Sequence, residues 1–574
     1  MRFTFASRSS LCALALTAMV AGCSGGGSPL APAPGSQGAG SAIPSSVATM
    51  NAGWHDMGRA DAATHVDLAV VLKYHNSAGL EQLVEAQGDE SSPSYHHFLS
   101  PSQFDQMYGP TTADYALTIG QLQKAGFTVT NTSANRTVVD VSAPAPVAEK
   151  FFSTEIHLVR RQDGSIRYEN VRAETIPASL VNVVLSVVGL DNAHVLRPQY
   201  VVLPAGTPRT GGGTDAQGAP LFGPDGGYGP KVYRISYDFP KGLTGTGRAS
   251  GVVGDADFLD TDLAGYLSYF HVNRTGPPTQ RVLVDGGPPK GISQDSIETT
   301  LDVETIVSID PGTALYVYEA PQEPDLRKFT DLYNRVVTDN KVDTVNTSYS
   351  ECETALVPSF PKAADAIETQ GAALGITFHA STGDYGTTTY GCSSGVTVGT
   401  PADTPHNVAI GGTIEQVNHT TGQETTEVGW NDSSGATGGG VSTVFPLPKY
   451  QNRIANAIKS GRNIPDVSFD ASPYTGESLY FEGGFSGPIG GTSLSSPIFG
   501  AGLTVIDQLK NSRAGYFNTN LYATWRANQY VKDTTVYFRD IISGSIPPYN
   551  AMKGYDQMSG IGAMQFANFA SVLR

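Results

Sequence analysis

The octet GGTSLSSP, residues 490–497, decides how the rest of this chain is interpreted. Its two glycines allow a tight turn and a close approach of the backbone to a substrate. The apolar residues 498–503 predict a buried helix that begins near Pro497. Ser493 then lies on a strained turn that opens a buried helix, an arrangement that exposes a nucleophile on a rigid support. In a chain with 65 glycines an ordinary Gly/Ser/Thr turn is the favoured interpretation of the octet alone, so partner residues must decide.

Length and composition indicate a soluble protein of more than one domain. The 574 residues exceed one ordinary domain and can form a large core. Charged residues make up 16% and hydrophobic residues 40%, a balance typical of loop-rich extracellular proteins. The net charge is −17 and no basic stripe is present, so we expect no nucleic-acid partner.

The N-terminus predicts export. Residues 1–23 contain two arginines and then the apolar segment 11–20, which is too short to span a membrane. The sequence VAGC, ending at Cys23, resembles a bacterial lipobox, although an ordinary signal peptide with an incidental cysteine is the alternative. We favour a lipid anchor through Cys23, because residues 24–48 form a Gly/Ser/Pro/Ala-rich tether. The protein would then be an outer-membrane lipoprotein, periplasmic or extracellular in a bacterium.

Two cysteines remain beyond this segment, Cys352 and Cys392. In an oxidising compartment the expected state of exactly two cysteines is a disulfide. A metal site would require more ligands.

Hydrophobic patterns divide the chain into two folded regions. Residues 49–195 predict a small α+β unit with no phosphate-binding loop and no cluster of acid, base and nucleophile. Residues 196–230 are rich in Gly, Pro, Ala and Thr and predict an exposed, cleavable linker. Residues 231–574 form the large domain. Here strands alternate with helices, and we expect the strands at 249–255, 281–284, 314–318, 343–348 and 375–380.

This alternation predicts a parallel, doubly wound α/β sheet. Functional residues should lie beyond the carboxyl ends of its strands. After Gly386 the pattern loosens, and we expect Gly/Thr/Ser-rich loops as far as the Ser493 helix.

Three carboxylates are candidate partners of Ser493. Glu298 and Asp302 are four residues apart on a predicted helix and so share one face. Like charges this close favour retention of one proton by the pair. A solvated polar face is the alternative, but apolar neighbours such as Leu301 indicate a largely buried helix. Asp384 follows an apolar strand in the turn ASTGDYG, residues 380–386, and is either a turn residue or a site residue.

Together these segments resemble the sedolisin family of serine-carboxyl peptidases, distant relatives of the subtilisins. Residues 298–304 resemble the acidic motif of that family, and residues 491–497 its Gly-Thr-Ser-x-Ser-x-Pro motif. Residues 381–384 resemble its Ser-x-Gly-Asp turn, with Thr382 where serine is usual. The resemblance extends from the region of His65 to the C-terminus. It implies a subtilisin-like catalytic domain preceded by a small α+β, ferredoxin-like activation pro-domain.

The resemblance also implies a role for each residue. Ser493 would be the nucleophile and Glu298 the general base, while Asp302 would orient Glu298 and share a proton with it. Asp384 would stay protonated and donate a hydrogen bond to the oxygen of the tetrahedral intermediate, which only a neutral carboxyl group can do. Both requirements predict activity in acid.

A single structural Ca²⁺ is implied near the C-terminus. Its ligands would be the carboxylates of Asp540 and Asp556 and the backbone carbonyls of Ile541, Met552 and Gly554, all hard oxygen donors. The family has glycine at the position of Met552, and the alternative is a loop with two incidental aspartates.

We therefore predict an exported, acid-acting, monomeric serine-carboxyl endopeptidase that cleaves proteins and peptides. It would be made as an autoprocessed zymogen inhibited by its own pro-domain. A tripeptidyl-peptidase of the same family and a non-catalytic, lipid-anchored binding protein are the alternatives. A subtilisin is disfavoured because neither His-Gly nor Asp-Thr-Gly occurs. A glycosidase is disfavoured because its carboxylate pair comes from different elements rather than from one helical turn.

Overall fold

The computed structural model describes residues 41–42, 53–203 and 212–573, apart from residues 323, 357, 393–394, 529 and 533. The predicted signal, the lipidation site Cys23, nearly all of the tether and residues 204–211 of the linker lie outside this range. Among the described helices none is both long and apolar enough to cross a membrane.

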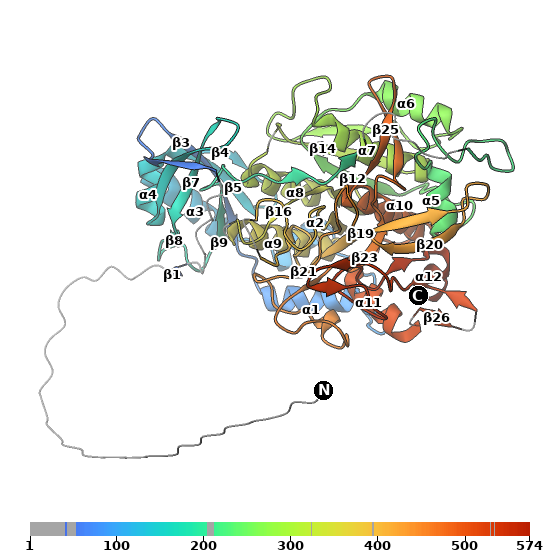
Figure 1. Cartoon of the computed structure of the whole chain (residues 1–574). Helices are drawn as coiled ribbons and strands as arrows, with labels where there is room; N and C mark the ends of the chain where they lie inside the picture. The colour runs from blue at the N-terminus through green and yellow to red at the C-terminus, as the bar shows by residue number, and fades with distance from the viewer. Residues whose placement is uncertain are drawn as a thin grey trace, which may run out of the picture. The chain divides into compact units, whose positions relative to one another are not determined.

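The N-terminal region is built on antiparallel sheets (Figure 1). Four strands pair in the order β4-β5-β3-β9, with bounds Thr128–Thr132, Val138–Pro144, His65–Leu72 and Val184–Val188. Three more pair in the order β2-β6-β7, with bounds His55–Arg59, Glu155–Arg160 and Ile166–Arg172. The mixed α+β class is thus confirmed, and the ferredoxin-like arrangement stays a prediction.

Helices α1, α2 and α3 of this region each begin at a side-chain cap. Helix α1 (Ser77–Gln87) has Asn76 as its N-cap, and α2 (Pro101–Met107) has a complete capping box between Ser100 and Gln103. Helix α3 (Thr112–Ala125) is capped by Thr111, and α4 (Ala145–Phe152) follows β5 directly. Helices α3 and α4 pack with the strands of this region, whereas α1 packs against α9 (Ser359–Ala373) of the large domain.

The described part of the large domain contains an eight-stranded, mostly parallel sheet. Its path is β13-β14-β12-β15-β17-β19-β20, and β23 also pairs with β19. All pairs in this sheet are parallel except β19 with β20, which is antiparallel. Their bounds are β12 Ala249–Gly254, β13 Gln280–Leu283, β14 Ala314–Glu319, β15 Thr344–Thr347, β17 Thr377–Ser381, β19 Asn407–Val417, β20 Glu424–Gly429 and β23 Val467–Asp470. All five predicted strands are confirmed, and with them the doubly wound sheet.

The expectation of loops after Gly386 is wrong, because β19, β20 and β23 lie in that region. Two glycines in the middle of β19, Gly411 and Gly412, weaken the strand pattern in the sequence. They are required by close packing: a Cβ at Gly412 would lie 2.6 Å from that of Ala471 and 3.0 Å from the ring of Trp430.

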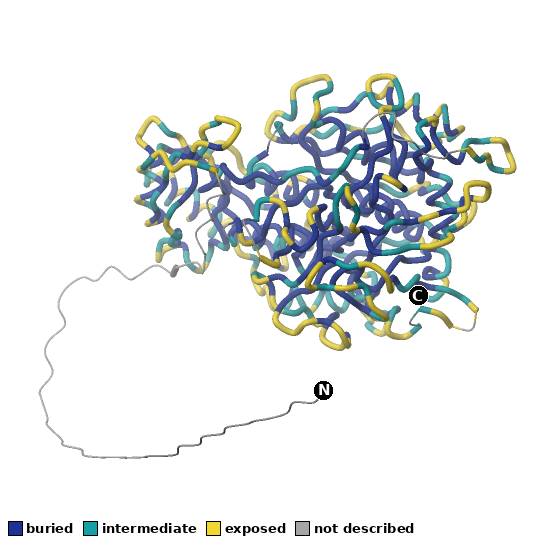
Figure 2. The backbone as a smooth tube through the Cα atoms, viewed as in Figure 1, coloured by how far each residue is buried: buried dark blue, intermediate teal, exposed yellow. Residues whose placement is uncertain are grey.

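Five helices of the large domain form two groups. Helices α6 (Asp260–Tyr269), α7 (Ser296–Ile309) and α10 (Thr492–Lys510) form one group, in which α7 packs against both of the others. Helices α8 (Leu326–Asp339) and α9 pack against each other and against strands of the N-terminal region. Every residue of α7 is buried, so the expectation of a largely buried helix is confirmed and a solvated polar face is excluded. Figure 2 shows the buried backbone running through both regions.

The two ends of the predicted linker are mostly buried or half-buried, whereas residues 216–218 are exposed. Gln199 is 1% exposed, and Leu221, Phe222 and Tyr228 are also buried. Strand β10 (Arg197–Pro198) pairs with β16 (Tyr349–Cys352), and β11 (Val201–Val202) pairs with β25 (Gly484–Gly490). At these ends the prediction of exposure is wrong, because a Gly/Pro-rich composition does not distinguish a solvated tether from an extended segment that pairs with strands of the folded domain.

Candidate active site

Ser493 is the second residue of α10, directly after a glycine turn. Gly491 has φ of 106°, a left-handed conformation that a residue with a side chain rarely adopts. The helix begins at Thr492, five residues before the expected start near Pro497. Because Pro497 has no N–H, the carbonyl oxygen of Ser493 lacks its helical donor, and Ser348 Oγ lies 3.4 Å from it.

Glu298 lies in the first turn of α7 and meets the Ser493 hydroxyl. The distance from Ser493 Oγ to Glu298 Oε2 is 2.9 Å, and that from Oγ to the carbonyl oxygen of Ser348 is 3.1 Å. Both Glu298 and Ser493 are fully buried. Burial, and secondarily the charge of Asp302, raise the pKa of Glu298 well above its ordinary value. The pair expected from the sequence therefore has hydrogen-bond geometry.

Asp302 lies one turn further along α7. Its Oδ1 accepts a hydrogen bond from Ser348 Oγ at 2.8 Å, and Asn346 Nδ2 donates to the same hydroxyl at 2.9 Å. Burial raises the pKa of Asp302 well above its ordinary value. Glu298 Oε1 and Asp302 Oδ2 are both buried and have no hydrogen-bond partner in the described part of the chain. Two unpaired carboxyl oxygens one helical turn apart are the arrangement in which a proton is retained.

Asp384 contacts Thr492, the residue that precedes the nucleophile. Its Oδ1 accepts hydrogen bonds from the backbone N–H and the hydroxyl of Thr492, at 2.8 and 2.9 Å. Its Oδ2 is buried without a partner among the described residues. Burial raises the pKa of Asp384 to about 7, against the opposing effect of the two Thr492 hydrogen bonds. The group is therefore protonated in acid, and Oδ2 is the oxygen free to carry the proton.

Histidine takes no part in these contacts among the described residues. The hydrogen bonds that involve Ser493 Oγ reach Glu298, Ser348 and Gln199. His379 packs behind the nucleophile helix, where its Nδ1 lies 2.9 Å from Ser496 Oγ, and burial lowers its pKa to about 3. A neutral imidazole that faces Ser496 cannot act as the base for Ser493.

Sequence reasoning missed two residues of this site. Ser348, at the end of the predicted strand 343–348, connects Ser493 to Asp302 through its carbonyl and its hydroxyl. Thr492 orients Asp384 and also binds the turn that carries it, because the Gly383 N–H donates to Thr492 Oγ1 at 3.0 Å. The available signal for both was their position at a strand end and at a helix start, where the residues of a site gather in such a sheet.

The expected cation ligands come from two segments, 540–541 and 552–556, which are joined by hydrogen bonds. The Gly554 N–H lies 3.2 Å from both oxygens of Asp540, and the Met552 N–H donates to Asp556 Oδ2 at 2.8 Å. Ile541 is buried beside Asp540. Met552 does not have a positive φ, so methionine in place of glycine causes no backbone strain here. No cluster of three or more His, Cys, Asp or Glu side chains suited to a metal occurs in the described chain, so carbonyl oxygens would have to complete the set.

The predicted disulfide is confirmed. Cys352, at the end of β16, is bonded to Cys392, and their Cα atoms are 5.5 Å apart. The bond ties the strand that carries Ser350 to the loop after Asp384.

Comparison with known proteins agrees with this geometry. Residues 52–193 match the family "Pro-kumamolisin, activation domain", and residues 298–562 match the "Subtilase family". The chain is 30% identical over 528 residues to kumamolisin of Bacillus sp. (strain MN-32), covering 88% of this chain and 91% of that protein. It is 26% identical over 512 residues to tripeptidyl-peptidase 1 of Homo sapiens, covering 83% and 85%. A solved structure of Pseudomonas sedolisin, a serine-carboxyl proteinase in complex with pseudo-iodotyrostatin, has a TM-score of 0.54 at 27% identity over 60% of this chain and 97% of that one.

Proposed function

The chain belongs to the family of serine-carboxyl peptidases that includes kumamolisin and sedolisin, and on this basis we propose that Ser493, Glu298, Asp302 and Asp384 carry out its peptide hydrolysis. The observation that supports this assignment most is the 2.9 Å contact between Ser493 Oγ and Glu298 Oε2. A buried carboxylate within hydrogen-bond reach of a serine hydroxyl can accept its proton as the hydroxyl attacks.

Each residue then has one task in acyl transfer. Ser493 Oγ attacks the substrate carbonyl while Glu298 accepts its proton. The developing oxyanion is stabilised by the Ser493 N–H and by a proton on Asp384 Oδ2. Glu298 returns the proton to the leaving amine, which breaks the peptide bond and leaves an acyl ester on Ser493. Water, deprotonated by Glu298, hydrolyses the ester and restores the enzyme.

Asp302 and Ser348 keep Glu298 in a reactive state. A proton shared between Glu298 Oε1 and Asp302 Oδ2 would satisfy both of these unpaired oxygens and leave Glu298 Oε2 facing the serine. The Ser348 hydroxyl fixes Asp302 by donating to its Oδ1. The arrangement resembles an aspartate that orients a histidine in other serine peptidases, with a carboxyl group in place of the imidazole.

Acid conditions suit this machinery. Asp384 must be neutral to donate, and its pKa is raised to about 7 by burial. At very low pH Glu298 can no longer accept the proton of Ser493. Activity should therefore rise as pH falls below neutrality and decline again in strong acid.

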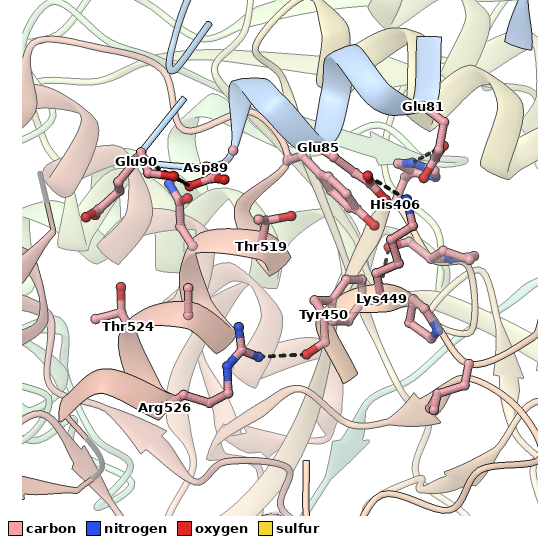
Figure 3. A pocket seen from close by; sticks show the side chains of 18 of the residues that line it. Glu81, Glu85, Asp89, Glu90, His406, Lys449, Tyr450, Thr519, Thr524 and Arg526 are labelled. Carbon is pink, nitrogen blue, oxygen red and sulfur yellow. Dashed lines mark hydrogen bonds and ion pairs between the residues drawn. The ribbon is translucent and has the colours of Figure 1, made fainter. Parts of the chain in front are cut away.

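The N-terminal region is proposed to inhibit the enzyme in the precursor. It contacts the large domain through a charged pocket next to α1 (Figure 3). In this pocket His406 Nε2 lies 3.2 Å from Glu81, and Lys449 Nζ lies 2.8 Å from Glu85. A second contact joins Asn135 Nδ2 to Asn334 Oδ1 at 2.7 Å. These contacts support the pro-domain as an intramolecular partner; the lipid anchor through Cys23, export from a bacterial cell and the monomeric state are proposals from the sequence alone.

An endopeptidase is favoured over a tripeptidyl-peptidase. The segment bound at Ser493 continues as an intact chain beyond its third residue on the acyl side, through the buried residues Val195 and Leu196. A tripeptidyl site would require a free amino group at that distance from the cut. Digestion of peptides blocked at the N-terminus separates the two activities, because only an endopeptidase cleaves them.

We also propose one structural Ca²⁺ near the C-terminus. Asp540 and Asp556 would supply carboxylate oxygens, and Ile541, Met552 and Gly554 would supply backbone carbonyls, a donor set that suits a hard cation. The two carboxylates already contact the same short segment, which supports the assignment. Bound calcium would neutralise their charges and tie the C-terminal loops together.

The experiment that tests the catalytic assignment compares two buried glutamates of one helix. Glu298→Gln should be nearly inactive at every pH because an amide cannot act as the base. Glu304→Gln is the matched control, since Glu304 is also buried in α7 but accepts from the Tyr480 N–H at 3.0 Å instead of from Ser493. Each variant precursor is processed by a trace of tagged wild-type enzyme, which is then removed before the peptide assay. Substantial activity in Glu298→Gln would refute the proposal.

A further inference from the structure

A short segment of the chain lies across the nucleophile and changes its partner strand there. Before the nucleophile, β10 runs antiparallel to β16, with Arg197 opposite Ser350 and Pro198 opposite Tyr349. After it, β11 runs antiparallel to β25, with Val201 opposite Gly490 and Val202 opposite Ile489. An extended peptide that adds a strand to an enzyme on both sides of a nucleophile is bound in the manner of a substrate.

Gln199 occupies the position between the two strands. Its N–H lies 3.1 Å from Ser493 Oγ and 3.1 Å from the carbonyl oxygen of Ser348. Its own carbonyl oxygen accepts a hydrogen bond from the Ser493 N–H at 3.0 Å. The carbonyl carbon of Gln199 is bonded to this oxygen and is separated from the Gln199 nitrogen by Cα alone. Because the nitrogen contacts Ser493 Oγ and the oxygen contacts the Ser493 N–H, the carbon between them lies beside Ser493 Oγ.

The Gln199 carbonyl also faces Asp384. A Cβ added at Gly491 would collide with the Gln199 carbonyl oxygen and would lie 2.6 Å from Asp384 Oδ2. The two oxygens therefore face the same point in front of Gly491, and this Asp384 oxygen is the buried one without a partner in the described chain. The Ser493 N–H and Asp384 Oδ2 are the two oxyanion donors of the mechanism proposed above.

We propose that the bond between Gln199 and Tyr200 is the one that the precursor cuts in its own chain. This inference rests on the proposed function and identifies the bond on which it acts. Ser493 Oγ attacks the Gln199 carbonyl carbon as its proton passes to Glu298; the bond to the Tyr200 nitrogen breaks, and that nitrogen takes the proton from Glu298. Water then hydrolyses the Gln199 ester, which leaves a pro-fragment that ends at Gln199 and a mature chain that begins at Tyr200.

The same placement identifies the side chain that the enzyme accepts on the acyl side of the cut. The Gln199 side chain is enclosed, and its Nε2 donates to the backbone oxygens of Arg197 at 2.8 Å and Ser350 at 3.4 Å. Its Oε1 faces Gly383, where an added Cβ would lie 3.5 Å away. A long, uncharged, unbranched side chain fits this subsite, whereas a charged one would be buried without a counterion.

The test follows the first cut in the purified precursor. The wild-type precursor is brought to acid in water enriched in ¹⁸O, and fragments from the earliest time points are identified by mass spectrometry. We expect an N-terminus at Tyr200 and one ¹⁸O atom in the new carboxylate of Gln199. A first cut elsewhere, in a precursor that still processes itself, would overturn the inference and leave the proposed function intact. Processing of the Ser493→Ala precursor would instead contradict the proposed function.

Two variants of the linker provide a matched comparison. Gln199→Lys should slow self-processing by at least about 10-fold, because it buries a charge next to the nucleophile. Gln217→Lys, at an exposed position of the same linker, should leave the rate unchanged. The mature enzyme is also given the free peptide VLRPQYVVL, the sequence of residues 195–203, and its counterpart with lysine for glutamine. Cleavage after glutamine in the first and slow cleavage of the second are expected, and equal rates for the two peptides would refute the subsite assignment without depending on folding of a variant.

Discussion

Replacement of Asp384 by asparagine tests the oxyanion donor directly. In Asp384→Asn the amide oxygen can still accept from the Thr492 N–H and hydroxyl, which hold Asp384 Oδ1 at 2.8 and 2.9 Å, while the amide nitrogen donates from the position of Oδ2. The variant therefore carries a donor that never titrates, whereas the wild type loses its donor proton above pH 7.

The structure sets the expected size of the effect. With a pKa of about 7, nearly all wild-type molecules carry the Asp384 proton at pH 5, and only about one in eleven carries it at pH 8. The ratio of kcat/KM for Asp384→Asn to that of the wild type should thus be constant in acid and rise about 10-fold per pH unit above pH 7. Asp384→Ala has no donor, and its kcat should fall about 100- to 1,000-fold at acid pH.

The assay is peptide hydrolysis by mature enzyme from pH 3 to pH 9, roughly the range over which carboxyl groups and perturbed neighbours titrate. Glu351→Gln is the control, because Glu351 is also buried with a pKa of about 7, yet its carboxylate accepts from the Cys352 N–H and does not contact Ser493. A ratio that stays flat through pH 8 for Asp384→Asn, or that rises equally for Glu351→Gln, would refute the role given to Asp384.

Three further predictions concern stability and activation. Chelation of calcium, or Asp556→Ala, should lower Tm by about 5 °C with little effect on substrate preference, because a ligand at 100 times its Kd contributes about 2.7 kcal/mol to the free energy of unfolding. An unchanged Tm in EDTA would contradict the calcium site. Burial raises the pKa of Glu477 to about 7 and that of Glu368 to about 8, so near neutral pH the native state binds protons that the unfolded state has released. The free energy of unfolding of Ser493→Ala, measured by urea titration, should therefore fall between pH 5 and pH 8. A rise over that range would contradict the sign of these shifts. Burial would raise the pKa of Glu81, but its partner His406 lowers it, so this contact holds the pro-domain at neutral pH and is lost in acid. Glu81→Gln should therefore reduce the pH dependence of pro-domain dissociation, measured by gel filtration after processing. An unchanged pH dependence would assign the dissociation to other groups.

Local patterns predict the elements that carry the site better than they predict the geometry of the site. Spacing alone places Glu298 and Asp302 on one helix, and α7 does contain both. The burial of Asp384 Oδ2 and the 2.9 Å contact between Ser493 and Glu298 could not be derived in this way, because they join segments about 200 residues apart. The family resemblance supplied that connection.

The errors also have physical causes. Proline favours the first turn of a helix, which predicts a start of α10 near Pro497. Instead Pro497 lies inside the helix, and the carbonyl oxygen that it leaves without a helical donor lies 3.4 Å from Ser348 Oγ. Glycine and proline dominate the linker and predict a solvated segment, yet Gln199 is bound at the nucleophile.

The two strands that flank Gln199 determine the kinetics of maturation. Because substrate and nucleophile belong to one molecule, the half-life of the precursor should be the same in a dilute solution as in a concentrated one. Cutting also leaves Val201 and Val202 paired with β25, in the groove that the leaving half of any later substrate must enter. The newly formed end is therefore a competitor at a high local concentration, and proteolysis of added peptides should appear with a lag after the chain is cut. Displacement of a strand, rather than bond breaking, would then set the moment at which the enzyme becomes active.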